Sequence, residues 1–456
     1  MIDAQQSDSY QKARLSRDAR FDGLFFIAVK TTGIYCRPIC PASPPKEQNV
    51  EYFHTAVQAA TAGYRPCLRC HPDSAPNSNR WQGTKTSFQR AIKLIDQGAL
   101  QTGSIEQLAD RLGITERYLR NLFHKYLGLS PKRYALYQQC LFAKQLLHQS
   151  HLSITEIALA SGFNSLRRFN DCFKNSMGVA PSKVRRGNES LLPPELTLKL
   201  YYRPPFNWRL LLQFLRQRQI EQLEWCHENT YGRTIELGTS TGYFEISPQP
   251  TVHYLNLKLH LNAYQNLNVL LHQIRRLFDL DVNSQQIDQQ LEPLFFDPFT
   301  YHHGLRLPGI WTLYEAGVRA ILGQQVSVKA ATNLATALVS NLGRVLDQNK
   351  RLFPSPESIA NSELAFLKMP QSRKDTLIRF SQWWTQTSNQ EDLEQWLSIK
   401  GIGPWTADYA RMRGLGDPDV WLGSDLGIKK QLSGQPWQTE KAAPWRSYMT
   451  LQLWHQ

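Results

Sequence analysis

The hydrophobic and polar positions of this 456-residue chain change their spacing along the sequence. Residues 84–186 place apolar side chains at i, i+3 and i+4, as amphipathic helices do, whereas the run LTLKLYY from Leu196 alternates like a strand. Helical spacing returns after a break near residues 295–308. The pattern predicts a helical segment, then an antiparallel sheet with helices, then a second helical region.

Two segments without periodicity interrupt these patterns. Residues 71–83 (HPDSAPNSNRWQG) and 185–194 (RRGNESLLPP) are rich in Pro, Ser, Asn or Gly, a composition typical of connections between domains. The chain is also too long for one hydrophobic core. We therefore expect four domains, at residues 1–76, 84–187, 194–295 and 296–456.

The first helical segment contains an internal repeat. Ser104-Ile105-x-x-Leu-Ala-x-x-x-Gly113 recurs as Ser153-Ile154-x-x-Ile-Ala-x-x-x-Gly162. In each copy a serine stands at the N-cap and a glycine stands where a tight turn follows the first helix. The pattern predicts a helix-turn-helix motif, present twice.

The charge distribution favours a nucleic-acid partner. The chain carries 52 Lys and Arg against 38 Asp and Glu, and +9 of its net charge of +14 lies in residues 81–190. The second helix of each copy offers polar side chains for DNA: Thr115, Arg117, Tyr118 and Arg120 in the first, and Asn164, Ser165, Arg167 and Arg168 in the second. Two such helices about one DNA turn apart can enter successive major grooves. A helical bundle with solvated basic faces is the alternative interpretation.

A Gly-x-x-Pro sequence closes each copy, at Gly128 to Pro131 and Gly178 to Pro181. With it, the whole segment resembles the AraC-type DNA-binding domain, which has two helix-turn-helix motifs. The resemblance implies sequence-specific binding to promoter DNA, and RNA polymerase as a further partner.

Four of the seven cysteines form two close pairs, Cys36 with Cys40 and Cys67 with Cys70. Two short loops of thiolates suit tetrahedral Zn²⁺, so we expect one zinc ion bound by four sulfurs. His54 and His71 are alternative ligands. A disulfide framework is the other interpretation, but the N-terminus shows no secretory signal, and we expect a cytoplasmic protein. No apolar run is long enough to cross a bilayer, so no membrane partner is expected.

The residues around the cysteines suggest reactivity as well as metal binding. Arg37, Arg65 and Arg69 lie beside the ligands and would attract a phosphate backbone. The stretches FFIAVKTTGIYCRPxC and AGYRPCxxC, within residues 20–73, resemble the N-terminal domain of the Ada methylation-response regulator. In that family the first cysteine of the cluster irreversibly takes a methyl group from a DNA methylphosphotriester. The matching residue is Cys36.

The same resemblance assigns DNA contacts to Thr32 and Arg65, whereas two basic contact positions of the family are Pro41 and Ser43 here. Methylation of a coordinated thiolate removes one negative charge, so the surface should repel phosphate less and bind DNA more tightly. The chain lacks the Pro-Cys-His-Arg motif of an alkylguanine acceptor, so that activity is not expected.

The second helical region contains a glycine hairpin, Gly401-Ile402-Gly403-Pro404, between two helical stretches. Backbone amides of such a turn can face a phosphate, and its carbonyls can hold a monovalent cation. The continuation Trp405-Thr-Ala-Asp and a carboxylate 20 residues past Trp405, Asp425, complete the pattern. From about residue 196 to the end the chain resembles AlkA-type 3-methyladenine glycosylases of the helix-hairpin-helix superfamily.

This resemblance assigns the catalytic role to Asp425, which would stabilise an oxocarbenium-like sugar while a flipped base stacks on aromatic side chains. Asp408 and Asp419 are the alternative carboxylates. The matching pocket positions are Trp405 and Trp454, with Tyr409 and Trp421 as further candidates.

Two positions bear on the reaction and on base flipping. Relatives that also cut the strand carry a lysine at the position of Trp405, so a monofunctional hydrolase without lyase activity is expected here. Gln324 and Gln325 match the loop that enters DNA, where a leucine can stand at the position of Gln325.

The sequence therefore predicts a multidomain α+β protein. Its parts are a small zinc-bound α/β domain, an all-α double helix-turn-helix domain, an antiparallel sheet with helices, and an all-α helix-hairpin-helix domain. The expected function is an adaptive response to DNA alkylation, in which a nucleoid-associated methyl sensor activates transcription and a glycosylase excises alkylated bases from double-stranded DNA. The alternative is a methylation-responsive regulator whose glycosylase half only anchors it to DNA. Loss of the catalytic aspartate or of the hairpin would favour that alternative, and neither is lost.

Overall fold

A computed structural model of the chain consists of two compact units, residues 1–134 and 135–456, which are described separately. The predicted connections at 71–83 and 185–194 fall largely outside the residues that the structure describes. The four predicted domain boundaries therefore stay predictions. The described residues are 4–17, 21–70, 72–73, 84–96, 98–185, 196–265, 267–295, 300–387, 390–432 and 439–456.

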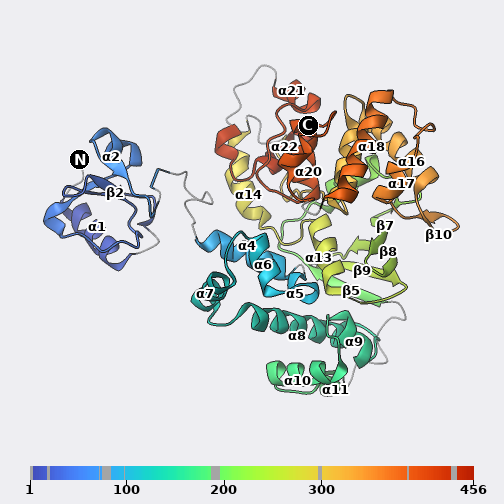
Figure 1. Cartoon of the computed structure of the whole chain (residues 1–456), viewed down its shortest axis with the longest axis horizontal. Coiled ribbons are helices and arrows are strands. Elements are labelled where there is room, and N and C mark those ends of the chain that lie inside the picture. The colour runs from blue at the N-terminus through green and yellow to red at the C-terminus, as the bar shows by residue number, and fades with distance from the viewer. Residues whose placement is uncertain are drawn as a thin grey trace. The chain divides into compact units, whose positions relative to one another are not determined.

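The first unit begins with a four-stranded sheet in the order β3-β1-β2-β4, in which β2 and β4 are parallel and the other pairs antiparallel. Alternating residues of β1 face opposite sides. Phe26 and Ala28 pack toward α2, and Ile27 packs toward α1, so helices cover both faces (Figure 1). The elements are α1 (Ala4–Ser16), β1 (Phe26–Val29), β2 (Ile34–Cys36), η2 (Glu47–Asn49), β3 (Val50–Phe53), α2 (Ala56–Thr61) and β4 (Arg65–Pro66).

The predicted repeat is present as two helix-turn-helix motifs. Ser104 and Ser153 form capping boxes at the starts of α6 and α9, and each turn contains a glycine with positive φ, Gly113 and Gly162. The helices of the first unit are α4 (Thr84–Asp96), α5 (Ala99–Thr102), α6 (Ile105–Arg111) and α7 (Glu116–Leu127). The helix α8 (Pro131–Gln149) begins before residue 135 and continues into the second unit, which also contains α9 (Ile154–Ala160), α10 (Leu166–Met177) and α11 (Pro181–Arg185).

A five-stranded antiparallel sheet follows, in the order β5-β9-β8-β7-β6. Leu196, Leu198 and Leu200 of β5 alternate inward, as the LTLKLYY pattern predicts, and the helices α12 and α13 contribute leucines to the same core. The elements are β5 (Leu196–Tyr201), α12 (Trp208–Gln217), β6 (Glu224–His227), β7 (Thr230–Leu237), β8 (Ser240–Pro248), β9 (Tyr254–Leu261) and α13 (Leu267–Leu277).

The remaining elements are mainly helical and build the predicted hairpin. α15 packs closely along α20 at Gly414, where an added Cβ would lie 2.9 Å from the Ala316 Cβ. This region also contains a short antiparallel ribbon of β10 (Val345–Asp347) and β11 (Lys350–Arg351), although the sequence predicted only helices here. The helices are α14 (Ser284–Leu291), η4 (Glu292–Leu294), α15 (Leu313–Gly323), α16 (Val328–Leu342), α17 (Pro356–Ala360), α18 (Gln371–Gln386), α19 (Leu393–Trp396), α20 (Pro404–Gly414), α21 (Leu426–Leu432), η6 (Thr439–Ala442) and α22 (Arg446–Trp454).

The observed architecture confirms the predicted fold class, a multidomain α+β chain with a small sheet domain, paired helix-turn-helix motifs, an antiparallel sheet and a helical region. Among the described residues, no helix is both long and apolar enough to span a bilayer.

Candidate functional site

The two cysteine pairs converge on one point. Their four Sγ atoms all lie within 4.8 Å of one another, and the Cys40 and Cys67 sulfurs are 3.9 Å apart. Four sulfurs at the Zn–S distance around a tetrahedral ion would be about 3.8 Å apart, so the donor set fits zinc. The parallel pairing of β2 and β4 brings the pairs together, because the Cys67 amide donates to the Tyr35 carbonyl at 3.0 Å.

The four sulfur-bearing side chains differ in exposure. Cys67 and Cys70 are each only 7% exposed, whereas Cys36 and Cys40 are half-buried. A substrate outside the domain can therefore approach only the first pair. His54 is exposed and outside the cluster, and His71 lies outside the described residues.

The arginines beside the cluster have different environments. Arg37 does not face a phosphate as expected, because it is 3% exposed, pairs with Asp22 and donates to the Cys70 carbonyl at 3.1 Å. Arg65 and Arg69 are exposed. The Arg65 amide donates to the Gly33 carbonyl at 2.8 Å, which places Arg65 beside the turn that carries the exposed Thr32. The structure thus brings both predicted DNA contacts close to β2, which ends at Cys36.

The four predicted DNA-binding arginines of the helix-turn-helix motifs are all exposed on the second helix of their motif. Arg120 pairs with Glu116 one turn earlier. Thr115 and Ser165, expected to face DNA, use their hydroxyls to cap α7 and α10. The arginines are Arg117 and Arg120 on α7, and Arg167 and Arg168 on α10.

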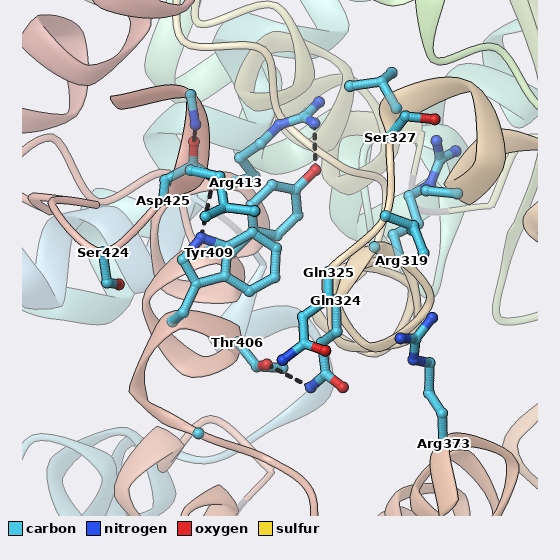
Figure 2. Close-up of a pocket in the computed structure, with 18 of the residues that line it drawn as sticks. Arg319, Gln324, Gln325, Ser327, Arg373, Thr406, Tyr409, Arg413, Ser424 and Asp425 are labelled. Carbon is cyan, nitrogen blue, oxygen red and sulfur yellow. Dashed lines mark hydrogen bonds between the residues drawn. The ribbon is translucent and has the colours of Figure 1, made fainter. Parts of the chain in front are cut away.

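The second unit contains a cavity of about 1070 Å³ between the hairpin, the end of α15 and the starts of α16, α18 and α21. Asp425 lines it at the start of α21 (Figure 2). Its Oδ2 accepts from the Trp405 indole at 3.1 Å. Its Oδ1 accepts from the Trp454 indole at 3.3 Å and from the amides of Gly427 and Ile428 at 3.0 and 3.3 Å. One oxygen is thus anchored by three donors, while the other has a single described donor.

Three of the four predicted aromatic residues line this cavity. The rings of Trp405 and Tyr409 stack with centroids 5.3 Å apart, and Trp454 lies 6.5 Å from Tyr409. Trp421 is described but is not among the lining residues, and it packs against the hydrophobic cluster around Val420.

The alternative carboxylates are used elsewhere. Asp408 lies 3.7 Å from Arg411, and Asp419 forms an ion pair with Arg446 at 2.7 Å. Neither is among the residues that line the cavity. Of the three aspartates considered, only Asp425 faces the cavity.

Arg218 and Arg413 are among the lining residues that were not identified from the sequence. Arg413 donates to the Tyr409 hydroxyl at 2.7 Å, and Arg218 lies 3.6 Å above the Phe214 ring. Burial, together with the neighbouring positive charge of Arg413, lowers the pKa of Arg218 to about 10. Arg413 stands four residues after Tyr409 on the same helix, and this i,i+4 spacing could have indicated that the two side chains meet. Arg218 lies far from the hairpin in the sequence, and the sequence carried no local signal for it.

The hairpin needs glycine at its first position. Gly401 has φ +100°, and a Cβ there would lie 2.0 Å from the Thr376 hydroxyl. Gly403 is the N-cap residue of α20. The Gln324 amide group donates to the Gly401 carbonyl and to the Thr406 hydroxyl, both at 3.0 Å (Figure 2). The exposed Gln325 has φ +55°, which is rare for a residue other than glycine.

Three domain families match the chain. The metal binding domain of Ada matches residues 9–73, a helix-turn-helix domain matches 108–187, and the AlkA N-terminal domain matches 197–312. The first match, together with the four-cysteine cluster, identifies one zinc ion as the metal of this chain.

Individual proteins of similar sequence agree with these matches. A probable bifunctional transcriptional activator/DNA repair enzyme AlkA of Mycobacterium tuberculosis is 34% identical over 97% of this chain and 95% of its own length. DNA-3-methyladenine glycosylase 2 of Escherichia coli is 33% identical over 56% of this chain and 96% of its own. The structure of a methylated N-Ada/DNA complex covers 28% of this chain and 93% of that chain at 37% identity, with a TM-score of 0.23.

The similarity to the Mycobacterium tuberculosis protein extends over nearly the full length of both chains. The chain is therefore a member of the family of bifunctional Ada/AlkA transcriptional activators and DNA repair enzymes.

Proposed function

We propose that this protein senses methylated DNA through Cys36, activates transcription through its paired helix-turn-helix motifs, and excises alkylated bases with Asp425. These activities belong to four domains, the sensor at 1–76, the helix-turn-helix domain at 84–187, the sheet domain at 194–295 and the glycosylase domain at 296–456. The protein acts on double-stranded DNA in the cytoplasm, associated with the nucleoid, and its regulatory half works with RNA polymerase.

The observation that carries the glycosylase proposal is the position of Asp425 in the cavity. A carboxylate with one lightly bonded oxygen lies beside stacked aromatic rings, in a space large enough for a flipped nucleotide. An alkylated purine carries positive charge and stacks well on electron-rich rings such as those of Trp405 and Tyr409.

In the proposed reaction the bond between the sugar C1′ and the base nitrogen breaks, and its electron pair neutralises the cationic base. The positive charge passes to the sugar, beside the Asp425 carboxylate, and a water molecule then adds at C1′ and loses its proton. Trp405 stands where a Schiff-base lysine would be needed, so the strand is not cut.

In the sensor, the Cys36 sulfur attacks the methyl carbon of a methylphosphotriester. A carbon–sulfur bond forms, the carbon–oxygen bond breaks, and the phosphate leaves as a diester that carries the negative charge. Bound zinc would keep the sulfur in its nucleophilic thiolate form. Thr32 and Arg65 are exposed next to β2, which supports the proposal that they contact the DNA strand.

Base release from alkylated DNA is the experiment that tests this proposal. The full-length protein should liberate 3-methyladenine from methylated duplex DNA and leave abasic sites without strand cuts. If the protein binds such DNA but releases no base, the glycosylase half is an anchor, and the catalytic proposal is wrong.

The hairpin completes the proposed grip on DNA. The backbone amides of Gly403 and Trp405, at the start of α20, can meet a backbone phosphate, since the space beside Gly403 is open. The predicted monovalent cation at this turn stays a prediction, and the Gly401 carbonyl already accepts from Gln324.

We expect Gln325 to fill the gap that a flipped base leaves. Its left-handed backbone costs about 1 to 3 kcal/mol for a residue other than glycine, a strain that often marks a functional position. Replacing it by alanine should slow base release from a duplex about tenfold, which corresponds to ~1.4 kcal/mol. The same variant should release the base at the wild-type rate when the lesion lies opposite a gap in the other strand. In that substrate the damaged base has no pairing partner, and no space in the stack needs to be filled. Equal slowing on both substrates would contradict the role.

The recognition helices should contact DNA phosphates or bases with their arginines. We expect Arg167→Ala to weaken promoter binding and to reduce the slope of log K against log salt by about 1 if it neutralises one phosphate. Filter binding between low and moderate salt measures this slope. Lys199→Ala, which removes a cation on β5 outside the motifs, is the control and should leave the slope unchanged. An unchanged slope together with unchanged promoter affinity in Arg167→Ala would remove this side chain from the proposed interface.

A further inference from the structure

Four charged side chains are buried together where the antiparallel sheet meets α15. Glu224 on β6 and Arg233 on β7 are 6% and 1% exposed, and Glu315 and Arg319 on α15 are 0% and 12% exposed. Arg319 contacts both glutamates, Glu224 at 2.9 Å and Glu315 at 2.7 Å. Arg233 lies 2.9 Å from Glu315 and 3.5 Å from Glu224. The two positive and two negative charges compensate one another.

The glutamate of this cluster that lies on the sheet is ionised. Burial alone would raise the pKa of Glu224, but Arg319 and Arg233 outweigh that effect and hold the pKa below its ordinary value. Its Oε1 also accepts from the Tyr231 hydroxyl at 2.8 Å. All four members therefore have charged or hydroxyl partners inside the protein.

Two members of the cluster also bind the backbone segment 218–220, which forms a wall of the cavity. The Ile220 amide donates to Glu224 Oε2 at 3.0 Å, and Arg319 Nη1 donates to the Arg218 carbonyl at 3.3 Å. The side chains of Arg218, Ile220 and Arg319 line the cavity. The cluster thus connects this wall directly to α15.

α15 ends at Gly323, immediately before Gln324 and Gln325 at the cavity mouth. Figure 2 shows Arg319 on the side of the cavity opposite Asp425, with Gln324 and Gln325 between them. One set of ion pairs therefore sets the distance between the Arg218 wall and the loop proposed to enter DNA.

Stability alone does not account for this arrangement. A buried group of ion pairs is often no more stabilising than apolar side chains of similar volume, because each charge loses its hydration. Apolar side chains could not bond the Arg218 carbonyl and the Ile220 amide, however, and so could not define the position of this segment.

We propose that Arg319 and Glu224 are positioning residues for base excision, which hold the segment 218–220 as a fixed wall against the flipped base. This inference rests on the proposed glycosylase function. The sheet domain thereby contributes to the reaction without touching the sugar, since its ion pairs determine where the cavity wall stands.

A matched pair of variants in the full-length protein tests the inference. Arg319→Lys keeps the positive charge but loses the guanidinium group, whose separate nitrogens bond both Glu224 and the Arg218 carbonyl. Arg233→Lys makes the same change in a member that bonds no part of the segment. Single-turnover release of 3-methyladenine should slow about 10- to 100-fold in Arg319→Lys, as expected for a displaced wall, and should stay near wild type in Arg233→Lys.

A second readout separates positioning from folding. The DNA concentration that half-saturates the reaction should not change in Arg319→Lys, because the hairpin that grips the backbone is untouched. If the two variants slow equally and in proportion to their losses in melting temperature, the cluster is only structural and the inference is wrong. Unchanged release in Arg319→Lys would also overturn it.

If Arg319→Lys does not fold, a second pair decides. Glu224→Asp draws the acceptor away from the Ile220 amide, whereas Glu315→Asp shortens a glutamate that bonds no part of the segment. Slower release in the first alone supports the inference, and equal release in both refutes it. If the wild type itself releases no base, the proposed function fails and this inference fails with it. Normal wild-type release with unaffected variants refutes only the inference.

Discussion

Asp425→Asn is expected to lower the rate of 3-methyladenine release about 100- to 1,000-fold, the range seen when one preorganised electrostatic group is removed from an active site. The change removes the negative charge beside the developing sugar cation. It also puts an amide in place of a carboxylate whose two oxygens accept from Trp405, Trp454 and two backbone amides. If the asparagine NH₂ group faced either indole, two hydrogen-bond donors, the amide N–H and the indole N–H, would face each other.

Release of free base from methylated duplex DNA, measured under single-turnover conditions, checks this result. Asp408→Asn is the matched control, since Asp408 lies on α20 in the same compact unit, is outside the cavity and has Arg411 as its described ion-pair partner. DNA binding should persist in both variants. If Asp425→Asn keeps more than about a tenth of the wild-type rate, the carboxylate is not the catalytic group.

Cys36→Ser is expected to abolish methyl uptake from methylphosphotriester DNA. A serine hydroxyl is not ionised near neutral pH and is a far weaker nucleophile than a thiolate. Burial of Cys67 and Cys70 keeps those sulfurs from a DNA strand. Exposure alone does not single out Cys36 from Cys40, so the assignment to Cys36 depends on its match to the methyl-accepting cysteine of the Ada family.

Mass spectrometry of the whole protein, followed by peptide mapping, measures the uptake. The wild type should gain one methyl group on Cys36, a result that does not depend on whether the variant folds or retains zinc. Cys172→Ser, which changes a half-buried cysteine outside the cluster, should still take one methyl group. Methyl transfer to Cys40, or uptake by Cys36→Ser, would move the acceptor role to another residue.

Much of the fold could be predicted from sequence because its signals are local. The repeated Ser and Gly positions define capped helices and tight turns within a few residues of chain, and the structure has them at Ser104, Gly113, Ser153 and Gly162. The alternation in LTLKLYY indicates one buried face, which β5 presents. The β10–β11 ribbon was not anticipated, since its strands are too short for a periodic pattern.

The candidate sites were only partly predictable. Spacing and family resemblance pointed to the cysteines, Asp425 and the residues near the hairpin. The environment of each side chain depended on partners far away in the chain. Arg37 is neutralised by Asp22, while Trp421 packs in a hydrophobic cluster and not along the cavity.

The sequence by itself determined the order of the parts, the four-cysteine pattern, the paired helix-turn-helix motifs and the family. Each of these depends on residue types at short spacings, where backbone geometry leaves few alternatives. Only the tertiary structure decided which carboxylate faces the cavity, and that Arg218 and Arg413 share it. Only the fold revealed that buried ion pairs connect the sheet to α15. Such relations join residues that are far apart in the chain, 82 positions for Arg233 and Glu315, and only packing in three dimensions brings their side chains within bonding distance.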